Sequence, residues 1–171
     1  MSYELEDISF KELLGYSIKG EETAYKAYMN ISETLSGLPA DRFQSLAEEE
    51  LDHKKKLLNL HDYKFGDKDY IAPEKEGLPP HEGDLIDFDP KKLNSFIEAL
   101  ESAIEAEKNA YELYYQLAKR EKNHSLLFNY IAIMEKGHQF SLEEEKEMYE
   151  KVLKNKGGDA SFDELNFLTY E

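Results

Sequence analysis

The sequence predicts an all-α protein folded as one antiparallel four-helix bundle. Three observations predict it: four long stretches repeat apolar residues every three or four positions, two of their connections are short and one is long, and one pattern of glutamate and histidine occurs in both halves. With 171 residues, 40% of them hydrophobic, the chain can bury a single core. We expect one domain over residues 1–155, with a crossover loop at 62–89, and a C-terminal tail at 156–171.

The four helices are expected at residues 8–36, 39–60, 89–120 and 125–155. Gly37 followed by Pro39 ends the first helix and starts the second. Asp89 followed by Pro90 is typical of a helix start, with an acidic cap and a proline at the first helical position. The tail is expected to add a short helix, with Phe162, Leu165 and Leu168 on its apolar side.

The lengths of the connections predict the topology. Short joints between the first two and the last two helices make each pair antiparallel neighbours. Residues 62–89 are long for a bundle loop and can run the length of the bundle, so that the third helix starts at the same end as the second. Two hairpins joined by one long crossover is the ferritin-like topology.

Composition excludes several classes of function. The net charge of −16 argues against nucleic acid and against an anionic membrane surface. The chain has no cysteine, hence no disulfide, thiolate zinc site or iron–sulfur cluster. It has no apolar run long enough to span a membrane, and its acidic N-terminus does not resemble a secretory signal. We expect a cytoplasmic protein with neither nucleic-acid nor membrane partners.

A repeated motif carries the chemical information. Glu50 and His53 form a Glu-x-x-His site, and Glu135 and His138 repeat it 85 residues later. Each site follows a Glu-x-x-Ala-Tyr-x-x-Tyr segment, which begins at Glu21 in one half and at Glu107 in the other. The two hairpins therefore look like copies of one unit.

A single Glu-x-x-His site would mean little in this chain. With 26 glutamates, about 15% of the chain, and five histidines, about one match is expected by chance. Glu121 and His124 make a third match, at the joint between the third and fourth helices, and we interpret it as the chance one. Two matches in register with two copies of a longer motif are much harder to obtain by accident.

The spacing favours a two-metal site. Residues three apart share one helix face, so each Glu-x-x-His pair can bind one ion. The apolar stripes place all six residues inside the bundle, where carboxylates need a partner, and no lysine or arginine occupies these stripes. Two divalent cations would balance the four carboxylates; iron or manganese fits the mixed ligands, and zinc can substitute. The predicted metal ligands are Glu21, Glu50, His53, Glu107, Glu135 and His138.

This constellation resembles the rubrerythrin-like branch of the ferritin-like superfamily, over about residues 8–155. The resemblance implies two iron ions, bridged by Glu50 and Glu135, with Glu21 and Glu107 as terminal ligands. It also implies that Tyr28 and Tyr114 lie close behind the site. The ligand set departs from full-length rubrerythrins at one position, since a seventh acid of that family is replaced here by Ala110.

A second departure concerns the electron donor. Full-length rubrerythrins carry a four-cysteine rubredoxin module, and this chain has no cysteine. Electrons are therefore expected from a separate protein such as rubredoxin, or from a small reductant.

The function implied by the resemblance is reduction of hydrogen peroxide or dioxygen. Two alternatives stay open: a ferroxidase that feeds an iron store, and a non-catalytic bundle clamped by metal. A homodimer is expected, and exchange of hairpins through the long crossover would be geometrically feasible.

Several further residues carry simpler expectations. Tyr25 and Tyr111 are expected to pack in the core, His61 and His81 to be surface histidines, and the acidic run 143–147 to be a solvated helix face. Gly137 is unusual inside a helix, where glycine costs about 1 kcal/mol relative to alanine. Close approach of another backbone, room for a bound molecule, or a π-type irregularity would each explain it.

Overall fold

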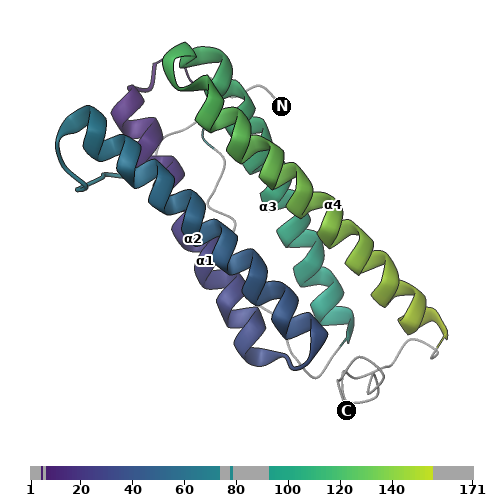
Figure 1. The fold of residues 1–171 in the computed structure, drawn as a ribbon. Coiled ribbons are helices and arrows are strands. Elements are labelled where there is room, and N and C mark those ends of the chain that lie inside the picture. Colours follow the sequence, from purple (N-terminus) through teal and green to yellow (C-terminus); the bar gives the residue numbers. More distant parts are fainter. Residues whose placement is uncertain (1–4, 6, 74–77, 79–92, 156–171) are drawn as a thin grey trace.

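The computed structural model describes residues 5, 7–73, 78 and 93–155. These residues form four long α-helices and one short 3-10 turn (Figure 1): α1 (Phe10–Thr34), α2 (Leu38–Phe65), α3 (Leu93–Arg120), η2 (Lys122–His124) and α4 (Ser125–Asn155). The prediction of an all-α four-helix bundle is confirmed. Among the described residues, no helix is long and apolar enough to cross a lipid bilayer.

Contacts at the helix ends establish the topology. α1 packs along α2, and α3 packs along α4. The starts of α2 and α3 meet, because the rings of Phe43 and Phe96 lie 5.8 Å apart. The end of α3 meets the start of α1, because Arg120 donates to the carbonyl oxygens of Leu5 and Ile8 at 2.5 and 2.8 Å. α2 and α3 therefore run in the same direction, as the predicted single long crossover requires (Figure 1).

α1 starts two residues later than expected because its first turn is capped. The Ser9 hydroxyl accepts from the backbone N–H of Glu12 at 3.3 Å, and the Glu12 carboxylate accepts from the backbone N–H of Ser9 at 2.9 Å. This reciprocal capping box satisfies N–H groups that have no partner inside the helix.

α2 extends to Phe65, beyond the predicted end at Leu60. The helix stops at Gly66, which has the left-handed conformation with a φ of 76° and donates to the carbonyl of Asp62 at 2.8 Å. The crossover consequently leaves the bundle at Gly66 rather than at residue 62. The predicted helix start at Asp89, the rest of the crossover at 74–77 and 79–92, and the tail at 156–171 lie outside the described residues.

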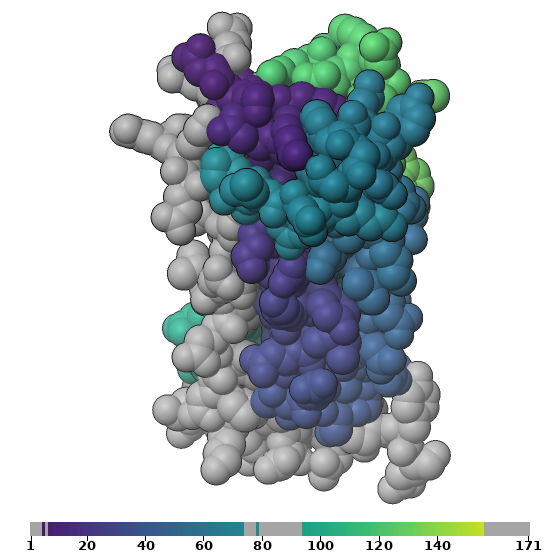
Figure 2. All heavy atoms as spheres, turned by 90° about the vertical axis from the view of Figure 1, so that its left-hand side faces the viewer, coloured from purple at the N-terminus to yellow at the C-terminus, as the bar shows by residue number. Residues whose placement is uncertain are grey.

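The described part of the crossover passes closely over α1. A methyl group on Gly15 would overlap the backbone carbonyl of Ile71, so only glycine fits at this point of α1. Figure 2 shows the teal segment before residue 74 lying across the purple helix. The contact holds the start of the crossover against the first hairpin.

The described residues of the bundle form two apolar clusters rather than one continuous core. One cluster lies where α2 and α3 begin and includes Tyr28, Phe43, Phe96, Leu100 and Tyr149. The other lies toward the opposite end and includes Leu14, Ile18, Leu57, Leu117 and Phe128. Between the two clusters each helix carries a buried glutamate, accompanied on α2 and α4 by a buried histidine, and this polar layer contains the candidate site.

Candidate metal centre

Six buried ionisable side chains form the polar layer. α1 contributes Glu21, α3 contributes Glu107, and α2 and α4 each contribute a Glu-x-x-His pair whose members share one helix face. None of the six is more than 5% exposed. The structure thus brings together all the residues that the sequence predicts as ligands: Glu21, Glu50, His53, Glu107, Glu135 and His138.

The six residues fall into two overlapping groups. Within each group, one oxygen or nitrogen atom per residue lies within 4.8 Å of all the others. The first group is Glu21, Glu50, His53 and Glu135; the second is Glu50, Glu107, Glu135 and His138. Glu50 and Glu135 belong to both groups, so the layer contains two adjoining positions that share two carboxylates.

The two histidines face these shared carboxylates in a similar way. His53 Nδ1 lies 2.9 Å from Glu135 Oε1 and 3.2 Å from Glu50 Oε2. His138 Nδ1 lies 2.9 Å from Glu50 Oε1 and 3.6 Å from Glu135 Oε2. The ring centroids are 5.9 Å apart. The arrangement is approximately twofold, as the sequence repeat predicts.

Each unshared carboxylate accepts a hydrogen bond from a tyrosine of the opposite hairpin. The Tyr28 hydroxyl, on α1, donates to Glu107 on α3, and the Tyr114 hydroxyl, on α3, donates to Glu21 on α1. Burial and the nearby carboxylates raise the pKa of both tyrosines well above the ordinary value, which keeps the hydroxyls protonated and able to donate. The predicted placement of both tyrosines directly behind the site is therefore observed.

Burial and mutual charge determine how the layer holds protons. Burial raises the pKa of Glu21 and Glu107, and the charges of Glu135 and Glu50 raise it further. Burial would also raise the pKa of Glu50, but hydrogen bonds from both histidines outweigh it and the net direction is downward. Neighbouring carboxylates likewise overcome the effect of burial on His53 and His138, whose pKa values are raised. Without metal, the layer therefore retains protons on its histidines.

The donor set fits a pair of divalent cations. Glu50 Oε1, Glu135 Oε1 and His138 Nδ1 are fully buried at the centre of the layer, where Glu50 Oε1 lies 2.9 Å from His138 Nδ1 and Glu135 Oε1 lies 2.9 Å from His53 Nδ1, without good hydrogen-bond geometry. Carboxylate and imidazole atoms that are incompletely satisfied at such depth are costly. Cations bound between them would satisfy these atoms and neutralise the four carboxylates, and oxygen with imidazole nitrogen is the ligand mixture of iron and manganese sites.

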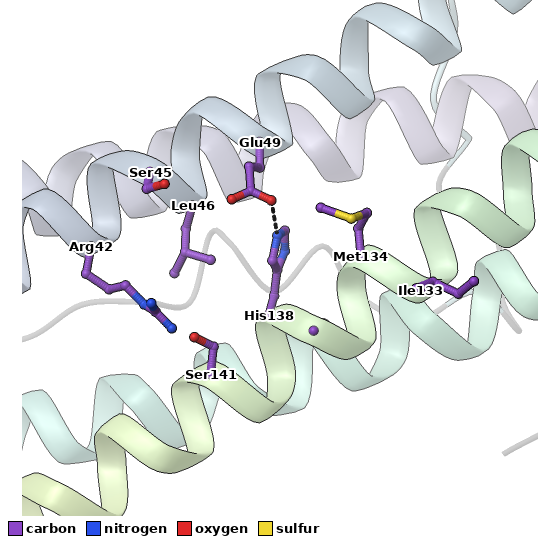
Figure 3. A pocket seen from close by; sticks show the side chains of 9 residues that line it. Arg42, Ser45, Leu46, Glu49, Ile133, Met134, His138 and Ser141 are labelled. Carbon is purple, nitrogen blue, oxygen red and sulfur yellow. Dashed lines mark hydrogen bonds and ion pairs between the residues drawn. The ribbon is translucent and has the colours of Figure 1, made fainter.

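A pocket of about 240 Å³ between α2 and α4 borders this layer. Figure 3 shows His138 from α4 and Glu49 from α2 pointing toward each other in it, with His138 Nε2 3.2 Å from Glu49 Oε2. Arg42, Ser45 and Ser141 add polar groups, while Leu46, Ile133 and Met134 add apolar ones. Sequence reasoning missed Glu49, because an acid next to a ligand in a glutamate-rich helix resembles an ordinary surface residue.

The pocket also bears on Gly137. A methyl group built on Gly137 would have no atom within 4 Å, so close approach of another backbone is not the reason for this glycine. α4 is α-helical throughout, without a π-type irregularity. Gly137 lines the pocket, and of the three explanations the geometry favours room for a bound molecule.

The remaining sequence expectations divide into correct and incorrect ones. His124 of the third Glu-x-x-His match lies outside both groups and stacks on Phe10, with ring centroids 5.7 Å apart. Tyr25 and Tyr111 pack against the two apolar clusters as expected. The expectation of a surface histidine at residue 61 was wrong: His61 is fully buried, and its Nδ1 lies 2.8 Å from the carbonyl of Asp67. His81 lies outside the described residues.

Ala110 marks the place of the missing seventh acid. This residue packs against the apolar cluster that contains Leu117 and Phe128, so hydrophobic contact occupies the position. Among the described residues, the ligand groups therefore contain four glutamates and two histidines and no further acid.

Fold and geometry together define a class: a four-helix bundle with a buried carboxylate–histidine site for two metal ions. A family model described as Rubrerythrin matches residues 12–146, and the chain belongs to the rubrerythrin family. Membership and the buried cluster both indicate a binuclear metal site. A search of curated proteins found no match.

Two solved structures share the fold. A hypothetical protein from Pyrococcus furiosus is 29% identical, with a TM-score of 0.76, and the match covers 87% of this chain and 95% of that one. A protein from Thermotoga maritima, provisionally described as a ferritin-like diiron-carboxylate protein, is 25% identical, with a TM-score of 0.62. That match covers 86% of this chain and 97% of the other.

Proposed function

We propose that this protein is a non-haem di-iron redox protein that reduces hydrogen peroxide or dioxygen to water with electrons from an external donor. The observation that carries the proposal is the sharing of Glu50 and Glu135 between two adjoining ligand groups. A pair of metal ions held side by side can receive both oxygen atoms of a substrate such as peroxide. A structural clamp for one ion would not need two overlapping groups.

The six ligands supply the binding chemistry. Glu21 with His53, and Glu107 with His138, complete the two positions on either side of the shared pair. Iron is the proposed metal, with manganese or zinc as substitutes, because all three accept carboxylate and imidazole ligands. When bound, two ferrous ions would supply Lewis acidity and the two electrons that convert one hydrogen peroxide and two protons into two water molecules.

The protein around the ligands would control access and geometry. The apolar clusters above and below the layer exclude bulk water, which strengthens electrostatic interactions in the site. Tyr28 and Tyr114 hold the unshared carboxylates Glu107 and Glu21 in place through their hydrogen bonds. The pocket beside His138 gives small molecules a place to approach the layer from solvent.

The proposal includes partners and location. Because these 171 residues contain no cysteine, the electrons come from a separate donor, such as a rubredoxin or a small reductant. We propose a homodimer in the cytoplasm as the working form, with exchange of hairpins through the long crossover as one way to build it.

The test is oxidation of the iron-loaded protein by peroxide. The protein is loaded anaerobically with two ferrous ions per chain and mixed with one equivalent of hydrogen peroxide, and the ferric absorbance is followed by stopped flow. We expect oxidation much faster than that of free ferrous ion, and loss of this acceleration in Glu50→Ala. Glu48→Gln is the matched control, because exposed Glu48 contacts Gln44 and not the site.

The same experiment separates the alternatives. Oxidation by peroxide no faster than in free solution contradicts the peroxidase proposal, and dioxygen is then tested in the same way. Uptake of many iron ions per chain into a large assembly, seen by light scattering, would instead indicate a ferroxidase that fills an iron store. Tight metal binding without any accelerated oxidation would indicate a structural clamp.

A further inference from the structure

The two histidines of the site are held differently by their surroundings. We infer that Glu49 is a positioning residue for His138, and that it makes the two metal positions unequal, so that the position formed with Glu107 and His138 fills first. The inference rests on the proposed metal centre but not on the reaction that the centre performs.

The two ring nitrogens of His138 face different surroundings. Nδ1 faces the shared Glu50 at 2.9 Å and Glu107 at 3.5 Å, inside the ligand group. Nε2 lies 3.2 Å from the Glu49 carboxylate, on the pocket side (Figure 3). When Nε2–H donates to a carboxylate, Nδ1 keeps its lone pair for the metal, the ring orientation is fixed, and the nitrogen becomes a stronger donor.

His53 lacks the equivalent carboxylate. The repeat relates Glu50 to Glu135, so the counterpart of Glu49 is Met134, whose thioether accepts hydrogen bonds only weakly. Among the described residues, every carboxylate paired with His53 faces its Nδ1. The ring of His53 instead meets Tyr130 edge to face at 6.3 Å. The approximate twofold symmetry includes the tyrosines behind Glu21 and Glu107 but does not extend to the surroundings of the two histidine Nε2 atoms.

Glu49 is well placed for this role. It sits next to the shared ligand Glu50 on α2, so the rigid helix that carries one ligand also orients a ligand of α4 on the opposite hairpin. His138 is its only ion-pair partner in the part of the chain that the structure describes. The side chain is 40% exposed, so its replacement leaves no buried cavity.

The test is titration of the metal-free protein with cobalt(II), followed by visible absorbance. We expect two steps in the wild type, one tighter than the other. Glu49→Ala should weaken the tighter step by about 10–100-fold, the usual cost of removing a partner that orients a ligating histidine. Glu49→Gln, whose amide oxygen still accepts a hydrogen bond, should weaken it less. Glu48→Gln is the control and should titrate like the wild type.

A second readout does not depend on affinity. In the cobalt-loaded protein, the ring N–H protons of both ligating histidines give strongly shifted NMR signals. We expect one of them, that of His138, to exchange slowly with solvent in the wild type and quickly in Glu49→Ala. A general loss of structure would instead alter the circular dichroism and both signals.

The outcomes are distinguishable. Unchanged cobalt affinity in Glu49→Ala, a change in the weaker step alone, or two ring protons that exchange equally in the wild type would overturn the inference while leaving the metal centre intact. Failure of the wild type to bind cobalt would overturn the metal centre, and this inference with it. If Glu49→Ala does not fold, two measurements still test the inference: the exchange rates of the two histidine ring protons in the wild type, and the cobalt affinity of Glu49→Gln.

Discussion

At the scale of single residues, Tyr28 and Tyr114 offer a symmetric test of the site. Each hydroxyl donates to a buried carboxylate, so phenylalanine would remove the donor and leave the carboxylate oxygen without it. An unsatisfied buried group of this kind costs about 1–3 kcal/mol. We expect both variants to lower the free energy of unfolding of the metal-free protein by similar amounts, measured by urea denaturation.

A third tyrosine provides the matched control. Tyr25 packs against an apolar cluster and belongs to neither ligand group. Tyr25→Phe should change the free energy of unfolding by less than either of the other two. A cost as large as theirs would show that loss of any tyrosine hydroxyl, rather than of these two hydrogen bonds, is responsible.

Because Glu145 is largely buried, we expect the free energy of unfolding to have an unusual pH dependence. The acidic run 143–147 was expected to be a solvated face, yet burial raises the pKa of Glu145 to about 7, although Arg42, 3.9 Å away, opposes the shift. The folded state therefore binds this proton more tightly than the unfolded state does. The stability that it confers is complete below the ordinary carboxyl pKa and is lost as the pH rises through about 7.

The corresponding variant is Glu145→Gln. Above pH 7 it should raise the free energy of unfolding by on the order of 1–3 kcal/mol, because it removes the cost of a buried charge. Below about pH 4.5 it should have little effect. Thermal denaturation across pH 4–9 measures the difference, with exposed Glu144→Gln as the control. A constant difference between Glu145→Gln and the wild type at all pH values would contradict the assignment.

At the scale of helices, two glycines inside helices should respond in opposite ways to the same substitution: Gly15 in α1 and Gly137 in α4. Gly137→Ala meets no atom and gains helix propensity, so we expect a stabilisation of up to about 1 kcal/mol. Gly15→Ala meets the backbone of Ile71, so the crossover must move, and a loss of about 1–3 kcal/mol is expected. Urea denaturation of both variants measures the contrast.

The helices show what sequence can and cannot predict. Apolar periodicity predicts the four helices to within a few residues, because each helix buries one stripe. It misses the last turn of α2, since a polar run precedes Gly66 and only the left-handed cap shows where the helix stops. It also misses the role of Gly15, because the need for glycine comes from a segment more than 50 residues away.

At the scale of the whole molecule, metal binding should release protons. In the metal-free protein, the surrounding carboxylates raise the pKa of His53 and His138, so both histidines are protonated near neutral pH. Each must lose its proton to bind metal. Apparent affinity should therefore fall as the pH is lowered, and calorimetry in buffers of different ionisation enthalpy should detect protons released on binding. Binding without proton release would contradict this.

The site itself was largely predictable, because a metal centre imposes residue types at fixed spacings. The six predicted ligands follow from two Glu-x-x-His pairs in register with two further glutamates on apolar stripes, and the structure brings all six together. The surroundings were not predictable. The contact of Glu49 with His138 depends on how α2 and α4 lie relative to each other, and no local pattern in either helix specifies that relation.

The sharing of ligands has a consequence for assembly. Each candidate ligand group takes three residues from one hairpin and the fourth from the other: Glu135 completes the group of the first hairpin, and Glu50 completes the group of the second. Neither hairpin alone can complete a position, so the docking of the two halves and the uptake of metal form one linked equilibrium. By the same logic, two identical half-length chains, each with one hairpin, would be expected to pair around a twofold axis and build the same centre.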